Sequence, residues 1–328
     1  MDFLLDSMHT DLASTVEAVT ARAGGIAVAR AWSEGDREPG LTVYRQLAES
    51  GITGLLVDDA LGGSGAGAVE MVVALEQLGR VALPGPVAET LAVAPALLGG
   101  AAANDDLAPL LAGDALASVA CAPVTPRAAD AEGAAVYLVT DDGLFRGVAD
   151  GAQATVDPAR TVSAVSAGDR LAGLDATAAV DLGALATSAL SLGLAAAMLE
   201  LAADYAKSRN QFGRAIGSFQ AVKHHLADVA IAVEMARPLV WGAAVGLDGF
   251  GQDTADVSRD VSAAKVATAE AADVAARRAL QVLGAIGYTA EHDFSLYLTK
   301  ARALRSAWGT PAWHRQRVLD SLRTEQAR

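Results

Sequence analysis

Two arginines, Arg209 and Arg214, flank a short turn that contains Gly213 and joins two long apolar segments. Ser218 follows at the expected start of the next helix, where its hydroxyl would accept a hydrogen bond from an unpaired backbone N–H. Arginine side chains beside such backbone donors suit a bound phosphate group. We therefore interpret residues 209–228 as a candidate phosphate-binding segment.

A second glycine-containing block lies at residues 281–289 and reads Gln-Val-Leu-Gly-Ala-Ile-Gly-Tyr-Thr. Its glycines would let the backbone approach a cofactor closely, because they carry no Cβ. Residues 209–228 resemble the second signature of the acyl-CoA dehydrogenase family, flavoenzymes that desaturate acyl-CoA thioesters. Residues 281–289 resemble that family's flavin-contacting Gln-x-x-Gly-Gly-x-Gly-Tyr-Thr, with Ala285 in place of one glycine.

The resemblance implies that FAD is the cofactor and that several residues contact it. Arg209 and Phe212 would face the pyrophosphate or adenosine of an FAD in a neighbouring subunit. Gln281, Gly284 and Gly287 would line the FAD from the other side. Thr310, near the end of the chain, would also contact it. Each FAD would then lie between two subunits.

Desaturation requires a base for the α-proton, a flavin that accepts the β-hydride and a polarised thioester carbonyl. In the family the base is a glutamate at one of two positions, and in this sequence those positions hold Trp308 and Gly183. An indole cannot accept a proton at working pH, and glycine has no side chain. Asp181 is the nearest carboxylate, although we interpret it as a helix cap. The sequence therefore predicts that both usual places for a catalytic base are empty.

Composition restricts the class of protein. Hydrophobic residues make up 52% of the 328 residues and aromatic residues 5%, which is typical of a helical core of small side chains. The net charge of −14 argues against nucleic-acid binding, which needs a basic surface. The single cysteine, Cys121, excludes an intramolecular disulfide and a cysteine-rich metal site. His224 and His225 have only Asp228 at ligand spacing, so we predict no metal.

One apolar stretch, residues 182–203, is long enough to cross a bilayer and carries a single charge, Glu200. It consists mainly of alanine, leucine, serine and glycine, and we interpret it as a buried helix of a bundle rather than a membrane span. Residues 1–6 are acidic and lack the basic region of a signal peptide, which predicts a cytoplasmic protein.

Hydrophobic periodicity predicts a mainly α protein with a small β domain. Residues 1–112 form an N-terminal helical domain, 113–180 a truncated middle β-domain, and 181–328 a C-terminal antiparallel four-helix bundle. The N-terminal helices expected are Leu12–Arg30, Leu41–Ser50, Val69–Gly79 and Val87–Leu98. The C-terminal helices expected are Leu182–Ser208, Phe219–Leu247 with a kink at Pro238, Thr254–Leu283 and Phe294–Ala307.

The strands expected in the middle domain are short and rich in valine and alanine: Leu116–Ala122, Ala134–Thr140, Gly143–Gly147 and Ala176–Val180. The sequence Asp141-Asp142-Gly143 is typical of a hairpin turn between the second and third of them. This domain is shorter than the middle domain that the family resemblance implies.

The leading hypothesis is a subunit of an FAD-dependent acyl-CoA dehydrogenase that lacks its own base and completes the FAD site of a partner subunit. The resemblance extends to α2β2 assemblies of this kind in actinobacterial steroid and lipid degradation, with an electron-accepting flavoprotein as the reoxidant. A second hypothesis is a self-sufficient homotetramer with a displaced base such as Asp181 or Glu291. A third is a structural or acyl-binding protein that kept only the fold.

Overall fold

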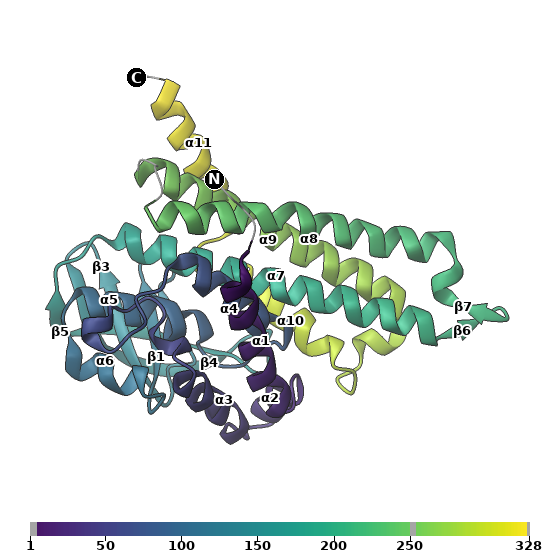
Figure 1. The fold of residues 1–328 in the computed structure, drawn as a ribbon, viewed down its shortest axis with the longest axis horizontal. Helices are drawn as coiled ribbons and strands as arrows, with labels where there is room; N and C mark the ends of the chain where they lie inside the picture. Colours follow the sequence, from purple (N-terminus) through teal and green to yellow (C-terminus); the bar gives the residue numbers. More distant parts are fainter. Residues whose placement is uncertain (1–4, 250–253, 327–328) are drawn as a thin grey trace.

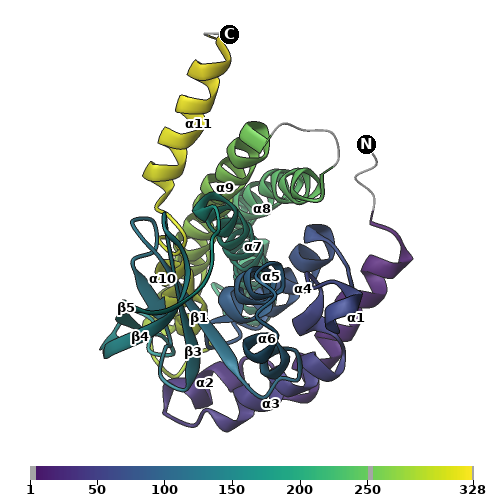
Figure 2. The same ribbon diagram turned by 90° about the vertical axis from the view of Figure 1, so that its left-hand side faces the viewer.

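The computed structural model describes residues 5–249 and 254–326. A long helical bundle carries a small sheet and a group of shorter helices at one end (Figure 1). Seen along the bundle, the sheet and the N-terminal helices lie beside each other, and the end of α11 projects from the body (Figure 2). The N-terminal segment used to predict a cytoplasmic location falls partly outside the described residues.

The N-terminal part is helical, as predicted. Its elements are α1 (Ser7–Arg22), α2 (Ala27–Ser33), α3 (Glu38–Glu49), α4 (Ala68–Arg80), a π-helical segment η3 (Glu89–Val93), α5 (Ala94–Gly100) and α6 (Asn104–Leu111). The single helix expected over Leu12–Arg30 is wrong, because Gly24 and Gly25 adopt left-handed backbone angles and separate α1 from α2. The short helix α6 was not predicted.

The middle part is one five-stranded sheet. Its strands are β1 (Leu116–Cys121), β2 (Arg127–Ala129), β3 (Ala134–Thr140), β4 (Gly143–Ala154) and β5 (Thr161–Ala172), in the order β1-β3-β4-β5-β2. β1 and β3 are parallel, and the other pairs are antiparallel. The hairpin predicted at Asp141-Asp142-Gly143 is confirmed, because Thr140 pairs with Gly143 across it.

Two expectations for the middle part are wrong. β4 continues to Ala154, well beyond Gly147, and Ala176–Val180 is helical rather than a strand. Asp175 begins the helix, because its carboxylate accepts from the backbone N–H of Thr177 at 2.8 Å. Asp181 is consequently inside the helix and is not its cap.

The C-terminal part contains α7 (Ala176–Ser208), α8 (Gln220–Leu247), α9 (Thr254–Leu283), α10 (Phe294–Leu304) and α11 (Pro311–Gln326). Helix α8 continues through Pro238. By length and composition alone α7 and α8 could each cross a bilayer, but 89% of the apolar stretch of α7 is buried inside the protein. For α8 the buried share is 39%, so much of its apolar surface faces outward.

A hairpin of β6 (Asn210–Gln211) and β7 (Arg214–Ala215) joins α7 to α8 at the end of the bundle farthest from the sheet (Figure 1). The N-cap predicted for Ser218 is wrong: its hydroxyl donates to the carbonyl of Ala215 at 2.7 Å, and Phe219 precedes the helix. The helix begins one residue later than predicted, so Ser218 lies before the N-cap position, and Phe219 at that position makes no capping hydrogen bond with its side chain.

Polar contacts hold the three parts together around one shared hydrophobic core. Thr90 of η3 exchanges two hydrogen bonds, each 3.0 Å long, with the backbone of Ala117 in β1. Asp248, after α8, accepts from the first backbone N–H groups of α4, at Ala68 and Val69. The first pair of contacts fixes η3 against the sheet, and the second fixes the N-terminal helices against the bundle.

Candidate functional site

Trp308 lies in the connection from α10 to α11 and is fully buried. Its backbone N–H donates to the hydroxyl of Thr125 at 2.8 Å, and its indole Nε1–H donates to the carboxylate of Glu89 at 2.9 Å. Its carbonyl accepts from Nε2 of His314 at 2.8 Å. Glu89 belongs to the N-terminal helices, Thr125 to the middle part and His314 to α11. One residue therefore connects all three parts of the molecule.

Gly183 of α7 packs directly against the Trp308 ring. A Cβ atom added at Gly183 would overlap the six-membered ring of the indole. The structure thus brings together the two positions at which the family resemblance expects a base. The indole fills the volume that a side chain at position 183 would need, so neither position presents a proton acceptor.

Asp181 is buried but already paired. Its carboxylate accepts from the hydroxyl of Ser258 at 2.5 Å and forms an ion pair with Arg317 of α11. Residues two apart on a helix project from different sides, so Asp181 does not share the face of Gly183. Glu291 is exposed in the connection between α9 and α10. These two carboxylates, named as displaced bases, therefore lie outside the Trp308 site.

Sequence reasoning missed Glu89, which is the buried carboxylate beside Trp308. It lines a cavity of about 10 Å³ together with Arg160, Thr187 and Lys300. That volume is about enough for one water molecule. No local motif marks Glu89, but it lies in a π-helical turn, a feature that is frequent at functional sites.

Lys265 of α9 extends this buried polar cluster. Its ammonium nitrogen donates to the hydroxyl of Thr187 and to the carbonyl of Leu304, both at 3.0 Å. Burial, reinforced by the positive charge of Arg160, lowers the pKa of Lys265 to about 7. Burial likewise lowers the pKa of His314 to about 4. A neutral His314 therefore carries its proton on Nε2, facing the Trp308 carbonyl.

The predicted FAD-contacting residues of the hairpin are exposed at the far end of the bundle. The Phe212 side chain is 92% exposed, and its backbone adopts a left-handed φ of 53°. Arg214 lies 4.1 Å above the ring of Phe219, whereas Arg209 is exposed at the end of α7. An exposed aromatic side chain on a strained backbone is a feature typical of ligand-binding positions.

The second block lies at the same end of the bundle. Arg278, one turn before Gln281 on α9, contacts His225 at 3.2 Å and Asp228 at 3.0 Å near the start of α8. Gln281 is exposed, and Gly284 begins the turn η5 (Gly284–Tyr288) with a left-handed φ of 65°.

The remaining two predicted contacts are placed differently. Gly287 is buried, and a Cβ atom added there would meet the side chains of Leu280 and Leu283. Thr310 is exposed at the start of α11, where its hydroxyl accepts from the backbone N–H of Trp313. It lies close to Trp308 in the chain, apart from the hairpin end of the bundle.

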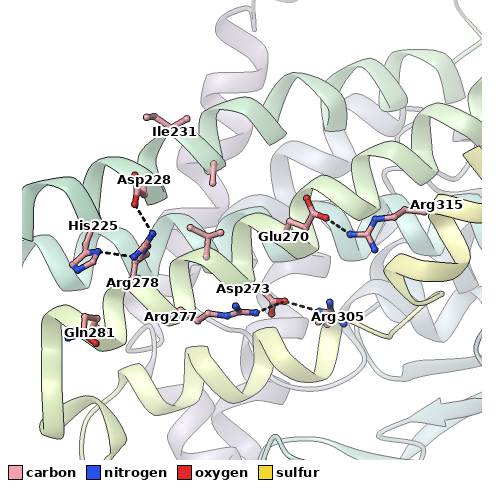
Figure 3. Close-up of a pocket in the computed structure, with 12 residues that line it drawn as sticks. His225, Asp228, Ile231, Glu270, Asp273, Arg277, Arg278, Gln281, Arg305 and Arg315 are labelled. Carbon is pink, nitrogen blue, oxygen red and sulfur yellow. Dashed lines mark hydrogen bonds and ion pairs between the residues drawn. The ribbon is translucent and has the colours of Figure 1, made fainter. Parts of the chain in front are cut away.

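An open groove of about 1040 Å³ runs along the outside of the bundle, with Gln281 at one end (Figure 3). Its arginines form ion pairs across the groove walls: Arg278 with Asp228, Arg305 with Asp273, and Arg315 with Glu270. These guanidinium groups would have to exchange partners before binding a phosphate. The groove does not include Trp308.

Metal chemistry has no support in residues 5–249 and 254–326, where no group of three or more histidine, cysteine, aspartate or glutamate side chains could hold an ion. Cys121 is buried, and burial raises the pKa of its thiol to about 11. A thiol in this state is a poor nucleophile and a poor ligand.

Comparisons with known proteins identify the family. The acyl-CoA dehydrogenase N-terminal domain matches residues 7–106, and the acyl-CoA dehydrogenase C-terminal domain matches residues 174–322. The chain is 32% identical to acyl-CoA dehydrogenase IpdE2 of Mycobacterium tuberculosis, over 96% of each chain.

Solved structures share the whole fold, including the middle part. A chain of the ChsE4-ChsE5 complex from Mycobacterium tuberculosis superposes with a TM-score of 0.81 and 25% identity, over 98% of this chain and 99% of that one. Butyryl-CoA dehydrogenase from Megasphaera elsdenii superposes with a TM-score of 0.84 and 20% identity, over 98% of this chain and 100% of that one. This chain belongs to the acyl-CoA dehydrogenase family.

Proposed function

We propose that this chain is the partner subunit of an FAD-dependent acyl-CoA dehydrogenase: it lacks a base of its own and completes the FAD site of a second, catalytic subunit. The observation that carries the proposal is the contact between Trp308 and Gly183. It closes both places where a base is expected, while Asp181 is paired with Arg317. The substrate would be the acyl-CoA of a lipid or steroid side chain, and a separate flavoprotein would accept the electrons.

The exposed residues at the hairpin end fit one edge of FAD. Arg209 would pair with the pyrophosphate, Phe212 would pack on the adenosine, and the left-handed turn at Gly284 would let backbone approach it. FAD, held mainly by the catalytic subunit, would supply the hydride acceptor. The interior of this chain does not fit a flavin ring, because Trp308 fills the space beside Gly183.

An exposed apolar surface on α8 supports association with another subunit. Ile231, Met235 and Leu239 lie one helical turn apart and are 63%, 69% and 43% exposed. Exposed apolar residues that line up in this way favour a protein interface. The similar fold of a chain of the ChsE4-ChsE5 complex is consistent with a mixed assembly. The cytoplasmic location and the α2β2 composition remain predictions.

The test is to purify the chain alone and together with the dehydrogenase subunit encoded beside it, and to measure the mass, flavin content and activity of each preparation. We expect the chain alone to be colourless and inactive. The joint preparation should hold one FAD for each catalytic subunit and reduce it with an acyl-CoA. A joint preparation with one FAD for every chain of both kinds would contradict the proposal.

A self-sufficient enzyme is the second candidate, and Glu89 is the observation that favours it. Glu89 is a buried carboxylate that accepts a hydrogen bond from Trp308, which occupies one of the usual base positions. In that case the chain alone would reduce FAD with an acyl-CoA, and Glu89→Gln would abolish the reaction. A yellow protein without turnover would instead favour a flavin-binding protein that has lost the chemistry.

A further inference from the structure

Trp308 is held at each of its polar groups by a different part of the protein. Its indole N–H donates to the carboxylate of Glu89 at 2.9 Å, and its backbone N–H donates to the hydroxyl of Thr125 at 2.8 Å. Its carbonyl accepts from the ring of His314 at 2.8 Å. We infer that Trp308 is an internal plug, clasped by these three residues, in a site whose walls suit a flat aromatic molecule with one N–H donor. The inference deepens the proposed function, because the plug is what closes this chain to ligands.

The site owes its flat shape to Gly183. Glycine inside a helix is unfavourable compared with alanine, so its presence needs a packing reason. Here the reason is direct, because any Cβ at position 183 would overlap the Trp308 ring. A planar ring therefore has a face of bare helix backbone to lie against.

The backbone around the plug is held in a costly conformation. Trp308 has a left-handed φ of 55°, which is rare for a bulky residue. Gly309 follows with a φ of 101°, and a Cβ there would overlap the ring of His314. This tight turn places the His314 ring against the Trp308 carbonyl, while Ser262 lies 3.1 Å from its other nitrogen. A strained conformation of this kind persists only where neighbouring contacts hold it.

The chemistry of the walls selects the ligand class. At the edge of the ring, Glu89 presents a buried carboxylate that accepts one hydrogen bond from the indole. Arg160 and Lys300 line the small cavity beside Glu89. A ligand without an N–H or O–H donor would leave this carboxylate unpaired, and an anion would be repelled by it. Indole meets both requirements, because it is uncharged and its single N–H can donate to Glu89 as the Trp308 side chain does.

The experiment replaces the plug with the free ligand. Trp308→Gly removes the indole, and glycine adopts the left-handed backbone of this position readily. We expect millimolar indole to raise the melting temperature of the isolated variant, and to bind at least about tenfold more tightly than indene, which has the same shape but no N–H. Trp241→Gly is the matched control, because Trp241 is half-buried on α8 and its removal leaves a surface notch.

The inference is overturned if indole leaves the melting temperature of Trp308→Gly unchanged, if indene is equally effective, or if Trp241→Gly responds in the same way. Hydrogen exchange of the indole N–H groups in the wild-type chain tests the plug even if the variant does not fold. We expect the N–H of Trp308 to exchange at least about a hundredfold more slowly than that of Trp313, which is 36% exposed. Similar rates would overturn the inference.

Neither measurement uses FAD or a partner subunit. If the inference about Trp308 is wrong, the measurements on the isolated chain will show it. If the proposed function is wrong, the number of FAD molecules in the joint preparation will show it.

Discussion

The interior around Trp308 and the hairpin end of the bundle differ in how far their side chains are buried and paired. In the interior, the polar groups of Trp308 are paired and the remaining cavity has room for about one water molecule. At the hairpin end, Phe212 is almost fully exposed on a left-handed backbone, and Arg209 and Gln281 are also exposed. This difference is what the proposed function expects: a closed interior, and an exposed surface that completes the FAD site of a second subunit.

Each region is stabilised in a different way. Interior residues contribute packing and buried hydrogen bonds, so substitutions there should change the stability of the isolated chain. Exposed residues at the hairpin end make few contacts within the chain, so substitutions there should change only what the chain binds.

The largest effect concerns Lys265 in the interior. Its pKa is about 7 in the folded chain and near 10.5 when unfolded, so the unfolded state binds more protons between these values. Stability should therefore rise by about 4 kcal/mol from pH 7 to pH 10 and level off above pH 10.5. Lys265→Met should remove this rise and be more stable at pH 7.

Chemical denaturation at pH 7, 8.5 and 10 measures the effect. Lys223→Met, an exposed lysine on α8, is the control and should keep the rise. If Lys265→Met and the wild type gain stability equally over this range, then Lys265 is not a buried neutral amine at pH 8.5.

The next effect concerns Arg209 at the hairpin end. Arg209→Ala should weaken FAD binding by the joint assembly about 100-fold, because a charge-assisted pair with phosphate is lost. The unfolding free energy of the isolated chain should change by less than about 0.5 kcal/mol. Fluorescence titration with FAD measures the first quantity, and Lys207→Ala, which removes an exposed charge two residues before Arg209, should leave it unchanged. If both variants lose FAD affinity equally, the positive charge of this surface as a whole, rather than Arg209 itself, determines FAD binding.

A smaller effect is expected at Gly183. Gly183→Ala should destabilise the chain by about 1–3 kcal/mol, because the added methyl overlaps the Trp308 ring. Gly99→Ala is the matched control: it is also helical, but its Cβ would meet its nearest neighbours at an ordinary 3.8 Å. The control should be neutral or slightly stabilising. Denaturant midpoints compare the two, and equal values would show that the interior is looser than the contact implies.

The smallest effect on stability is expected at Met235 on the outer face of α8. Met235→Glu should change the unfolding free energy of the isolated chain by less than about 0.5 kcal/mol, yet reduce the amount recovered with the catalytic subunit. Val148→Glu is the control, because Val148 is similarly exposed at 59% but lies on β4. Undiminished recovery of Met235→Glu would place the subunit interface on another surface.

The sequence predicts the class of most elements, and the errors have physical causes. Ala176–Val180 was predicted as a strand because a short apolar run fits a buried strand and a buried helix equally well. Asp175, whose carboxylate caps α7, resolves the ambiguity in the structure. β5 has only three large apolar residues, Val162, Val165 and Leu171, and exposed central positions, so hydrophobic alternation did not reveal it. The shortness of the middle domain relative to the family remains a prediction.

The site was predictable only in part. The empty base positions follow from residue types at Trp308 and Gly183, and the structure adds that these two residues touch. Glu89 and Thr125 were missed because they meet Trp308 through contacts between distant parts of the chain, which leave no local motif. His314 was missed although it follows Trp308 by six residues, because its contact depends on the turn before α11. Ser218 was predicted as a cap by its residue type, but a short 3-10 turn ends at Ser218 and Phe219 takes the N-cap position.

The most direct test of the central claim is an anaerobic titration of the isolated chain with FAD, followed by addition of an acyl-CoA. A chain whose interior is closed by Trp308 should bind well under one FAD per chain and show no bleaching of the flavin band. Stoichiometric binding with reduction of the flavin by the thioester would contradict the account.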